Sequence, residues 1–363
     1  MYQNELHALS KANRYRSKTL YPESLADFSS NDYLGFAQKH ALFERAVAQV
    51  SMYKTHAPKA SLLVNGYHPI HEEFENFMAR QNGFEAALVC GSGFLANFSL
   101  IEALPRKRDL LILDEEYHAS GMAAAKSVDA EVLHFSHNDA NHLEHLINTH
   151  PHNRIIIAVE GIYSMSGDLL NREIFEVADR YNALLIVDEA HSVGVVGNQL
   201  RGVFDLFGIT PQSNHIKMGT LGKALGSYGA YILCSQHLAE FLLNRAKAII
   251  YTTAPSLFDI ALGYQGFLNL LKNKEHLIEE IVKRQACVKT ELGIHMEGLI
   301  CSYPLDEKSD ALLVQKKLIE EGFLVGAIRP PTVKSPILRI IPRLSQTEDS
   351  LRELCAMVQK YTR

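Results

Sequence analysis

The stretch ALLIVDEAHS, residues 183–192, is the clearest guide to the fold. A run of apolar residues leads into Asp188 and His191, which is typical of a buried strand that ends in a polar loop. Segments of the same kind recur along the chain: AALVCGSG, DLLILDEEYH, VLHFSHND, RIIIAVEGIYS, HIKMGTLGK and GAYILCS. Because helical patterns separate several of these runs, the sequence predicts an α/β fold around a largely parallel sheet. In such sheets ligands bind beyond the carboxyl ends of the strands, where most of these polar residues fall.

The pattern changes after residue 256. Residues 257–292 predict one long helix, which leads into the strands LVGAIRPPTV and PILRIIPRL and the closing helix SLRELCAMVQKYT. We therefore predict an N-terminal segment over residues 1–38, a large domain over residues 39–270 and a smaller C-terminal α+β domain over residues 271–363.

Composition narrows the class of protein. The chain has 363 residues, 47% of them hydrophobic and 21% charged, which is ordinary for a soluble globular protein. The net charge of −5 and the lack of a basic tract argue against nucleic acid or a membrane surface as partner. The first residues lack the apolar core of a signal peptide, and no apolar run approaches the ~18 residues that span a bilayer. Five scattered cysteines without a CxxC pair indicate reduced thiols, so we expect a cytoplasmic protein.

A first hypothesis is dinucleotide binding. GSGFLA, residues 91–96, follows a predicted strand and fits the Rossmann fingerprint, and Asp114 ends the next strand 21 residues after Gly93. The alternative is a glycine-rich turn whose helix N-terminus binds any phosphate. About 90 residues precede this turn, whereas the fingerprint usually opens its domain, and the dinucleotide hypothesis gives no role to Lys223.

Lys223 lies in GTLGKALGSYGA, residues 219–230, among glycine, alanine and serine. The segment departs from a P-loop because two residues, not four, separate Gly219 and Gly222, and because Ala224 stands where the magnesium-binding hydroxyl belongs. A lysine with little bulk beside it can instead form a Schiff base with an aldehyde. An aspartate such as Asp188 can keep a pyridinium nitrogen protonated, and GSGF can bind a phosphate. Together these features predict pyridoxal phosphate chemistry.

The chain resembles the α-oxoamine synthases, a family of fold-type-I pyridoxal phosphate enzymes that condense an amino acid with an acyl thioester. Nine pieces match in order over nearly the whole chain: SSNDYLGF, GSGFLANFSLIEAL, YHASG, FSHND, VEGIYSMSGD, VDEAHSVGVVG, GTLGKALGSYGA, IIYTTAPS and AIRPPTV. Within the family, RPPTV resembles the enzymes of biotin synthesis that condense L-alanine with a pimeloyl thioester. The resemblance implies a transferase with a large, mostly parallel-sheet domain and a smaller C-terminal domain.

The resemblance also implies roles for individual residues. Lys223 would hold the cofactor covalently and act as the base, Asp188 would pair with the ring nitrogen, and His191 would bond the ring oxygen. His118 would stack on the ring and help to position the acyl group. The residues implied in cofactor binding are Gly93, Phe94, His118, Ser164, Asp188, His191, Thr220 and Lys223, and those implied in substrate binding are Arg14, His118 and Thr332.

The family further implies a homodimer in which Thr252 or Thr253 reaches the phosphate site of the partner. The substrates would be an amino acid and an acyl group carried by coenzyme A or by an acyl carrier protein. Residues 56–75, HAPKASLLVNGYHPIHEEFE, depart from the family pattern, so the acyl chain, its carrier and a use of glycine or serine stay open. The histidines at 142, 145, 150 and 152 lack a ligand set with metal-site spacing, and we predict a solvated helix end and no metal.

Overall fold

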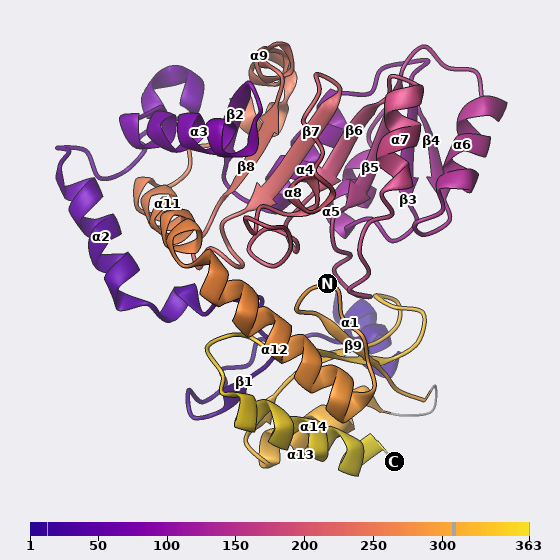
Figure 1. The fold of residues 1–363 in the computed structure, drawn as a ribbon. Helices are drawn as coiled ribbons and strands as arrows, with labels where there is room; N and C mark the ends of the chain where they lie inside the picture. Colours follow the sequence, from indigo (N-terminus) through magenta and orange to yellow (C-terminus); the bar gives the residue numbers. More distant parts are fainter. Residues whose placement is uncertain (13, 307–309, 363) are drawn as a thin grey trace.

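The computed structural model describes residues 1–12, 14–306 and 310–362, and within them a seven-stranded sheet forms the centre of the larger part of the molecule (Figure 1). Its strand order is β2-β8-β7-β6-β5-β3-β4, and β8 alone runs antiparallel to its neighbours. The strands are β2 Ala86–Cys90, β3 Leu110–Asp114, β4 Glu131–Phe135, β5 Ile155–Glu160, β6 Leu184–Asp188, β7 His215–Thr220 and β8 Ala230–Cys234. The predicted α/β fold with a mostly parallel sheet is therefore confirmed.

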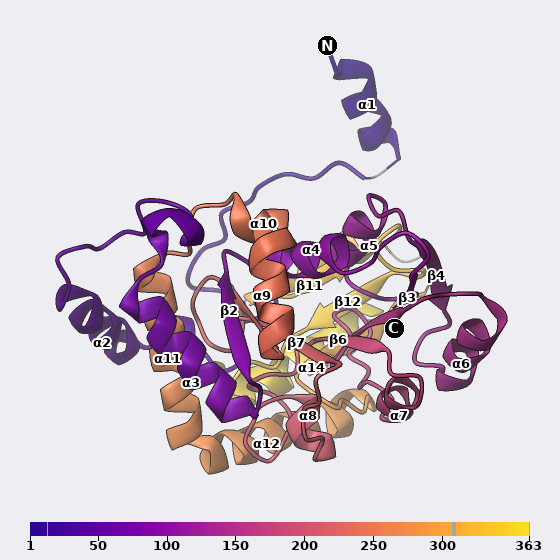
Figure 2. The same cartoon turned by 90° about the horizontal axis from the view of Figure 1, so that it is seen from above.

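Helices cover both faces of this sheet, which explains why its strands are apolar on both sides. Side chains of α4 Gly93–Ala103, α5 Ala119–Ala125 and α9 Gln236–Arg245 form one core with the strands. Side chains of seven other helices form the core on the opposite face. These are α2 His40–Ser51, α3 Pro69–Asn82, α6 Ala140–Thr149, α7 Glu173–Arg180, α8 Val203–Phe207, α11 Leu257–Lys272 and α12 Lys274–Leu292. Seen from above, the helices flank the sheet on two sides (Figure 2).

Residues 257–292 were expected to form one helix, and that expectation is wrong. The structure has α11 Leu257–Lys272 and α12 Lys274–Leu292, with Asn273 outside helical geometry between them. The Asn273 side chain donates to the Asn269 carbonyl oxygen at 2.8 Å and so ends the first helix. The break lets α12 run from the large sheet down to the smaller part of the molecule (Figure 1).

The smaller part is built on a three-stranded antiparallel sheet of order β11-β12-β9. Its strands are β9 Cys301–Pro304, β11 Gly326–Ile328 and β12 Ile337–Ile340, and its helices are α12, α13 Ala311–Glu320 and α14 Glu348–Thr362. The short strand β1 Ala26–Asp27, from the beginning of the chain, pairs with β10 Phe323–Leu324. A separate apolar core joins these elements.

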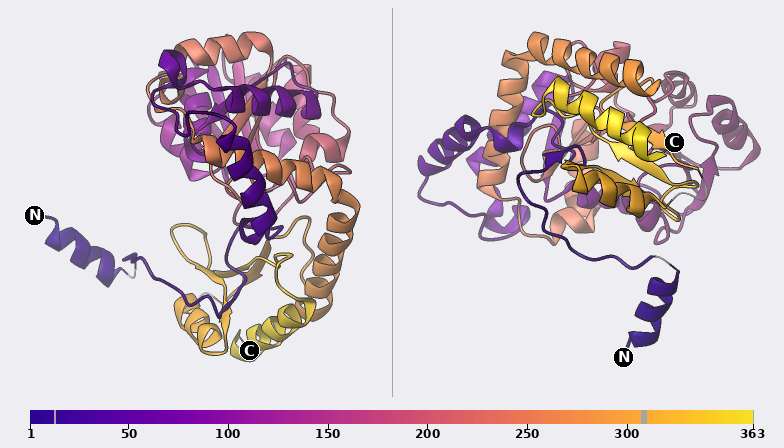
Figure 3. Two further views of the ribbon diagram at one scale, coloured as in Figure 1. Left: turned by 90° about the vertical axis from the view of Figure 1, so that its left-hand side faces the viewer. Right: turned by 90° about the horizontal axis from the view of Figure 1, so that it is seen from below.

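The first residues stand apart from the rest. Helix α1 Gln3–Lys11 buries none of its side chains and projects away from both sheets (Figure 3). The chain then forms a 3-10 turn at Phe36–Gln38, the helix α2 His40–Ser51 and a single π-helical turn at Leu62–Gly66. Further along the chain, the small helix α10 Lys247–Ile250 follows α9. The helices of the described residues are too short or too polar to cross a membrane.

Candidate active site

The Lys223 loop joins β7 to β8 at the carboxyl edge of the large sheet. Its small residues have packing reasons within the protein: a Cβ on Gly219 would lie 2.3 Å from the Tyr231 ring. Gly226 adopts a φ of 65°, and a Cβ there would lie 2.5 Å from the backbone nitrogen of Ala37. The glycines therefore let a tight loop pack on its own sheet and on the segment after Gly35, with the Lys223 side chain left half-buried.

The Lys223 amine takes part in a short chain of polar contacts. Its Nζ lies 2.7 Å from Nε2 of His191, and Nδ1 of the same ring lies 2.5 Å from the Tyr33 hydroxyl. Burial lowers the pKa of Lys223 to about 8 despite the opposing charges of Asp188 and Glu160. Burial also lowers the pKa of His191 well below its ordinary value, so this ring is neutral at physiological pH. Lys223 is thereby more often an uncharged amine than an exposed lysine is.

Asp188 ends β6 beside this chain of contacts. Its Oδ1 accepts from the Ala190 backbone N–H at 2.9 Å, and its Oδ2 accepts from Nδ2 of Asn97 at 2.6 Å. Asn97 lies on α4, and it also connects Asp188 to His118 through Ser120. The sheet edge thus brings together the three residues most strongly predicted from sequence, Asp188 and His191 on one strand end and Lys223 on the next.

The beginning of α4 lies next to the Lys223 loop. Ser92 caps the helix by accepting from the Leu95 N–H at 3.3 Å, and the N–H groups of Gly93 and Phe94 have no carbonyl partner within the helix. A Cβ on Gly93 would lie 3.8 Å from the Thr220 hydroxyl oxygen. The Thr220 hydroxyl donates to the Gly229 carbonyl oxygen at 3.0 Å. The two N–H groups have no hydrogen-bond partner among the described residues and are suited to a phosphate or another anion.

A second group of polar residues closes the site from the smaller sheet, and the sequence analysis missed it. Arg339 of β12 is 6% exposed, and it donates from Nε to the Ser164 carbonyl oxygen at 2.8 Å and from Nη1 to Asn31 Oδ1 at 2.9 Å. Its Nη2 is buried without a partner among the described residues, as is Oε1 of Glu160. Glu160 ends β5 in register with Asp188, and its Oε2 accepts from the Ser164 N–H at 3.0 Å. Asn31 and Glu160 both lie within sequence pieces that resemble the α-oxoamine synthases, and this resemblance could have identified them as site residues.

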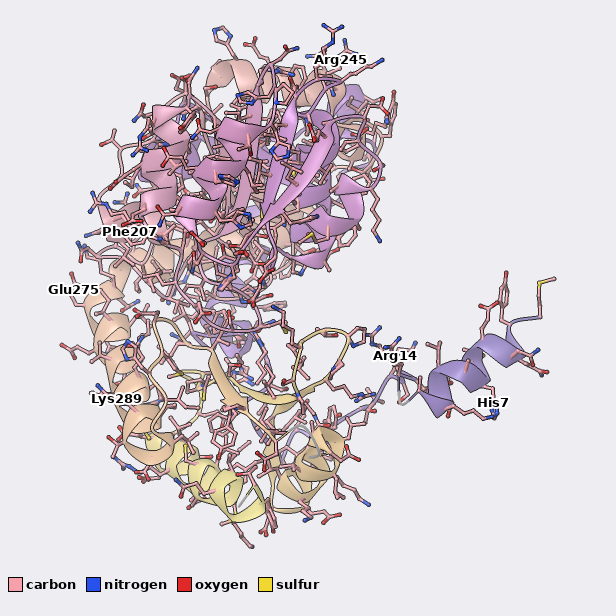
Figure 4. All side chains as sticks on the ribbon, turned by 90° about the vertical axis from the view of Figure 1, so that its right-hand side faces the viewer. His7, Arg14, Phe207, Arg245, Glu275 and Lys289 are labelled. Atoms are coloured by element: carbon pink, nitrogen blue, oxygen red, sulfur yellow. The ribbon has the colours of Figure 1, made fainter. Side chains whose placement is uncertain are left out.

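Four predicted residues lie outside this cluster. Arg14 is exposed on the segment after α1, well away from the sheet edge (Figure 4). Thr332 is exposed in the loop after β11. Thr253 is exposed, and Thr252 donates to the Ala248 carbonyl oxygen at 2.8 Å. Within one chain these residues do not meet the Lys223 loop, so their roles stay predictions.

Asp114, the residue on which the dinucleotide hypothesis depended, is fully engaged by the protein. One carboxylate oxygen accepts from the Glu116 N–H and meets His137 Nδ1 at 3.1 Å, and the other accepts from the Asn138 N–H and the Tyr163 hydroxyl, both at 2.8 Å. Against the effect of burial, hydrogen bonds to Asp114 and Asp168 raise the pKa of His137 to about 10. The carboxylate therefore fixes loops at the sheet edge instead of facing open space for a ribose.

The fold and this site define a class of protein. The sequence pattern of the family "Aminotransferase class I and II" matches residues 23–358, and the chain belongs to this family. Two relatives from Helicobacter pylori strains, each named 8-amino-7-oxononanoate synthase, are 41% and 40% identical over 100% of this chain and 98% of their own length.

Solved structures agree with this assignment. An 8-amino-7-oxononanoate synthase from Francisella tularensis is 26% identical, with a TM-score of 0.77 over 93% of this chain and 98% of that chain. A serine palmitoyltransferase from S. paucimobilis with bound PLP-myriocin is 21% identical, with a TM-score of 0.88 over 99% of this chain and 97% of that chain, and shows the shared fold. The predicted resemblance to the α-oxoamine synthases, nearest to the enzymes of biotin synthesis, is confirmed.

Proposed function

We propose that the protein binds pyridoxal 5′-phosphate and condenses L-alanine with a pimeloyl thioester, releasing carbon dioxide, the free thiol and 8-amino-7-oxononanoate for biotin synthesis. The observation that carries this proposal is the Lys223 amine, whose pKa is lowered by burial. His191 holds this amine beside the Asp188 carboxylate. Full-length identity of about two residues in five to relatives with that name supports the choice of substrates.

The residues at the sheet edge fit this cofactor. The N–H groups of Gly93 and Phe94 would hold its phosphate, and the Thr220 hydroxyl would join them by turning away from the Gly229 carbonyl oxygen. Asp188 would face its ring nitrogen, and two hydrogen bonds already fix the orientation of the carboxylate. His118 and Ser164 would contact the ring. When bound, pyridoxal phosphate supplies an aldehyde that reacts with amines and a ring that takes up the electron pair of a carbanion.

Lys223 would contribute two properties of its amine. With a pKa of about 8, about one tenth of the side chain is uncharged at pH 7, enough for it to act as a nucleophile. After the amino acid has displaced it, the same Nζ would accept the α-proton and later return it. His191 keeps Nζ in place at 2.7 Å, and Tyr33 in turn holds His191.

Arg339 would bind the carboxylate of the amino acid. Its Nη2 is buried and unpaired among the described residues, and a guanidinium is a donor with no acceptor capacity. A carboxylate is the partner that best matches such a group. The Ser164 carbonyl and Asn31 fix the guanidinium in orientation and leave its charge uncompensated. This arrangement would align the amino acid before its α-proton is removed.

The site would be completed by a second copy of the chain. The exposed positions of Thr253 and Arg14 support this part of the proposal, and Arg14 lies away from the sheet edge of its own chain (Figure 4). Thr332 would contact the acyl substrate from the smaller sheet. A carrier protein and coenzyme A are both compatible carriers of the acyl group.

A thiol-release assay tests the reaction. Purified protein with pyridoxal phosphate and pimeloyl-coenzyme A should release free thiol with L-alanine, and product mass should match 8-amino-7-oxononanoate. Glycine and L-serine are the matched controls. Faster release with either of them, or with a different acyl chain, would keep the family and replace the proposed substrates.

A further inference from the structure

Asn97 has three hydrogen-bond partners beside the site, and the proposed chemistry gives it no role. It lies on the first turns of α4 and is 1% exposed. Its Nδ2 lies 2.6 Å from Asp188 Oδ2 and 3.1 Å from Ser120 Oγ, and its Oδ1 lies 2.6 Å from the Tyr117 hydroxyl. The amide therefore links α4 to two other segments of the chain, residues 117–120 and the end of β6.

The chemistry of these partners fixes the direction of each hydrogen bond. Burial raises the pKa of Tyr117 well above its ordinary value, so its hydroxyl keeps its proton and donates to Asn97 Oδ1. The Asp188 carboxylate can only accept, so it takes one of the two Nδ2 hydrogens. The second Nδ2 hydrogen goes to the Ser120 oxygen.

The same logic continues to His118. Since Ser120 Oγ accepts from Asn97, its own hydrogen is free to donate, and His118 Nδ1 lies 2.7 Å away. The Ser120 backbone N–H donates to the same Nδ1 at 3.2 Å. Two donors facing one ring nitrogen require that nitrogen to be unprotonated. Burial lowers the pKa of His118, which favours a neutral ring with its single hydrogen on Nε2.

We propose that Asn97 is a positioning residue that holds Asp188 and, through Ser120, fixes His118 as the tautomer with its proton on Nε2. The consequence for the reaction rests on the proposed function. His118 would then present a hydrogen-bond donor to an oxygen of the acyl substrate and would not be a base, which leaves proton removal to Lys223. The buried Asn97 amide would thus orient two groups: Asp188, which would face the ring nitrogen of pyridoxal phosphate, and His118, which would donate a hydrogen bond at the face of that ring.

The tautomer can be observed directly, without turnover. The full chain is labelled with ¹⁵N-histidine, and side-chain nitrogen shifts and couplings are recorded with and without pyridoxal phosphate; His118→Gln identifies the signals. We expect the native protein to show His118 only as the Nε2–H form. A native Nδ1–H form would overturn the proposal.

Two variants separate the arms of the network. Ser120→Ala removes the hydroxyl donor at 2.7 Å and leaves only the longer backbone N–H contact at 3.2 Å, so both His118 tautomers should become detectable. It should lower kcat/KM for the acyl thioester about tenfold, the scale of one lost hydrogen bond, with the affinity for pyridoxal phosphate unchanged. Ser120→Thr, which keeps the hydroxyl, should restore the single tautomer. Asn97→Leu should disturb the tautomer and also weaken pyridoxal phosphate binding about tenfold, because Asp188 loses a donor.

Ser99→Ala is the matched control, because Ser99 is buried on the same helix and donates only to the Leu95 carbonyl oxygen. It should leave the tautomer and cofactor affinity unchanged. If Asn97→Leu does not fold, Ser120→Ala decides: an unchanged tautomer there overturns the proposal. The expected tautomers without any thiol release would support the positioning role and count against the proposed reaction instead.

Discussion

Lys217 and Lys223 lie six residues apart, and their surroundings differ in a way that separates a lysine that stabilises the fold from one that we assign to catalysis. Lys217 lies within β7 and is fully buried; its Nζ lies 3.7 Å from Glu189 Oε1 and donates to Asn82 Oδ1 at 2.9 Å and to the Arg201 carbonyl oxygen. Lys223 follows the same strand, and its Nζ is bonded to His191 at 2.7 Å. No ion pair joins a carboxylate to Lys223 among the described residues.

Burial lowers the pKa of both amines, so burial alone does not separate them. The difference is what surrounds each amine. Glu189 compensates the charge of Lys217, and two oxygen atoms accept its hydrogen bonds, whereas the hydrogen-bond partner of Lys223 is the neutral His191 ring. The same contrast holds for two arginines. Arg343 forms ion pairs with Asp27 and, at 2.9 Å, with Asp32, whereas no ion pair joins Arg339 to a carboxylate among the described residues. Lys223 and Arg339, the two cations of this comparison without a carboxylate partner there, are those that we assign to cofactor and substrate.

Replacing Lys223 should give the largest effect. Lys223→Ala removes the nucleophile and base, and turnover should fall by about 10³-fold or more, with little change in melting temperature. Thiol release and thermal unfolding measure the two properties. Lys107→Ala, at an exposed lysine, is the control and should leave both unchanged. A Lys223→Ala protein with more than a few per cent of native turnover would break the comparison.

Replacing Lys217 should have the opposite profile. Lys217→Met leaves the buried Glu189 charge unpaired, so the free energy of unfolding should fall by about 3–5 kcal/mol. Denaturant unfolding measures it, with the exposed Lys126→Met as control. The folded fraction should still bind pyridoxal phosphate. Native stability in Lys217→Met would show that pairing does not distinguish the two lysines.

The unpaired nitrogen of Arg339 leads to a prediction about affinity. Arg339→Leu should raise the L-alanine concentration for a half-maximal spectral response about 100-fold, because a buried charge-assisted pair is lost. Arg339→Lys keeps the charge but not the planar fork, and should recover only part of the affinity. An unchanged L-alanine response in Arg339→Leu would place the carboxylate elsewhere.

The smallest effect concerns pH. Because the pKa of Lys223 is lowered to about 8, its uncharged fraction rises about tenfold per pH unit below pH 8 and levels off above it. The rate of covalent pyridoxal phosphate uptake, corrected with a model lysine amine, should follow this curve. A midpoint near the ordinary lysine value of about 10.4 would mean that the site does not lower the Lys223 pKa.

Part of the site was predictable because it is local in sequence. Asp188 and His191 follow one apolar strand and Lys223 follows the next, so strand periodicity and the rule for sheet edges place them together. The turn at Gly93, to which we assign phosphate binding, follows β2 by the same rule. The buried strands of the large sheet were also clear, because helices cover both of its faces and the strands are apolar throughout.

The rest depends on contacts between distant residues. Tyr33 contacts His191, which is 158 residues away in the sequence, and Arg339 contacts Asn31, which is 308 residues away. The spacing of apolar residues along the chain does not predict such pairs. The break at Asn273 was missed because the apolar pattern continues through it, while a side-chain bond to Asn269 ends the helix. Strand β9 was missed because it is short and only partly buried.

Reductive trapping of the cofactor tests the central claim most directly. Purified protein is mixed with pyridoxal phosphate, its visible absorption is followed as L-alanine, glycine and L-serine are added, and a sample is reduced with borohydride and digested for mass spectrometry. We predict a yellow band that responds most strongly to L-alanine and a label on Lys223, with Lys217 unmodified. No band, or a label on another lysine, would contradict the assignment of Lys223 as the reactive amine.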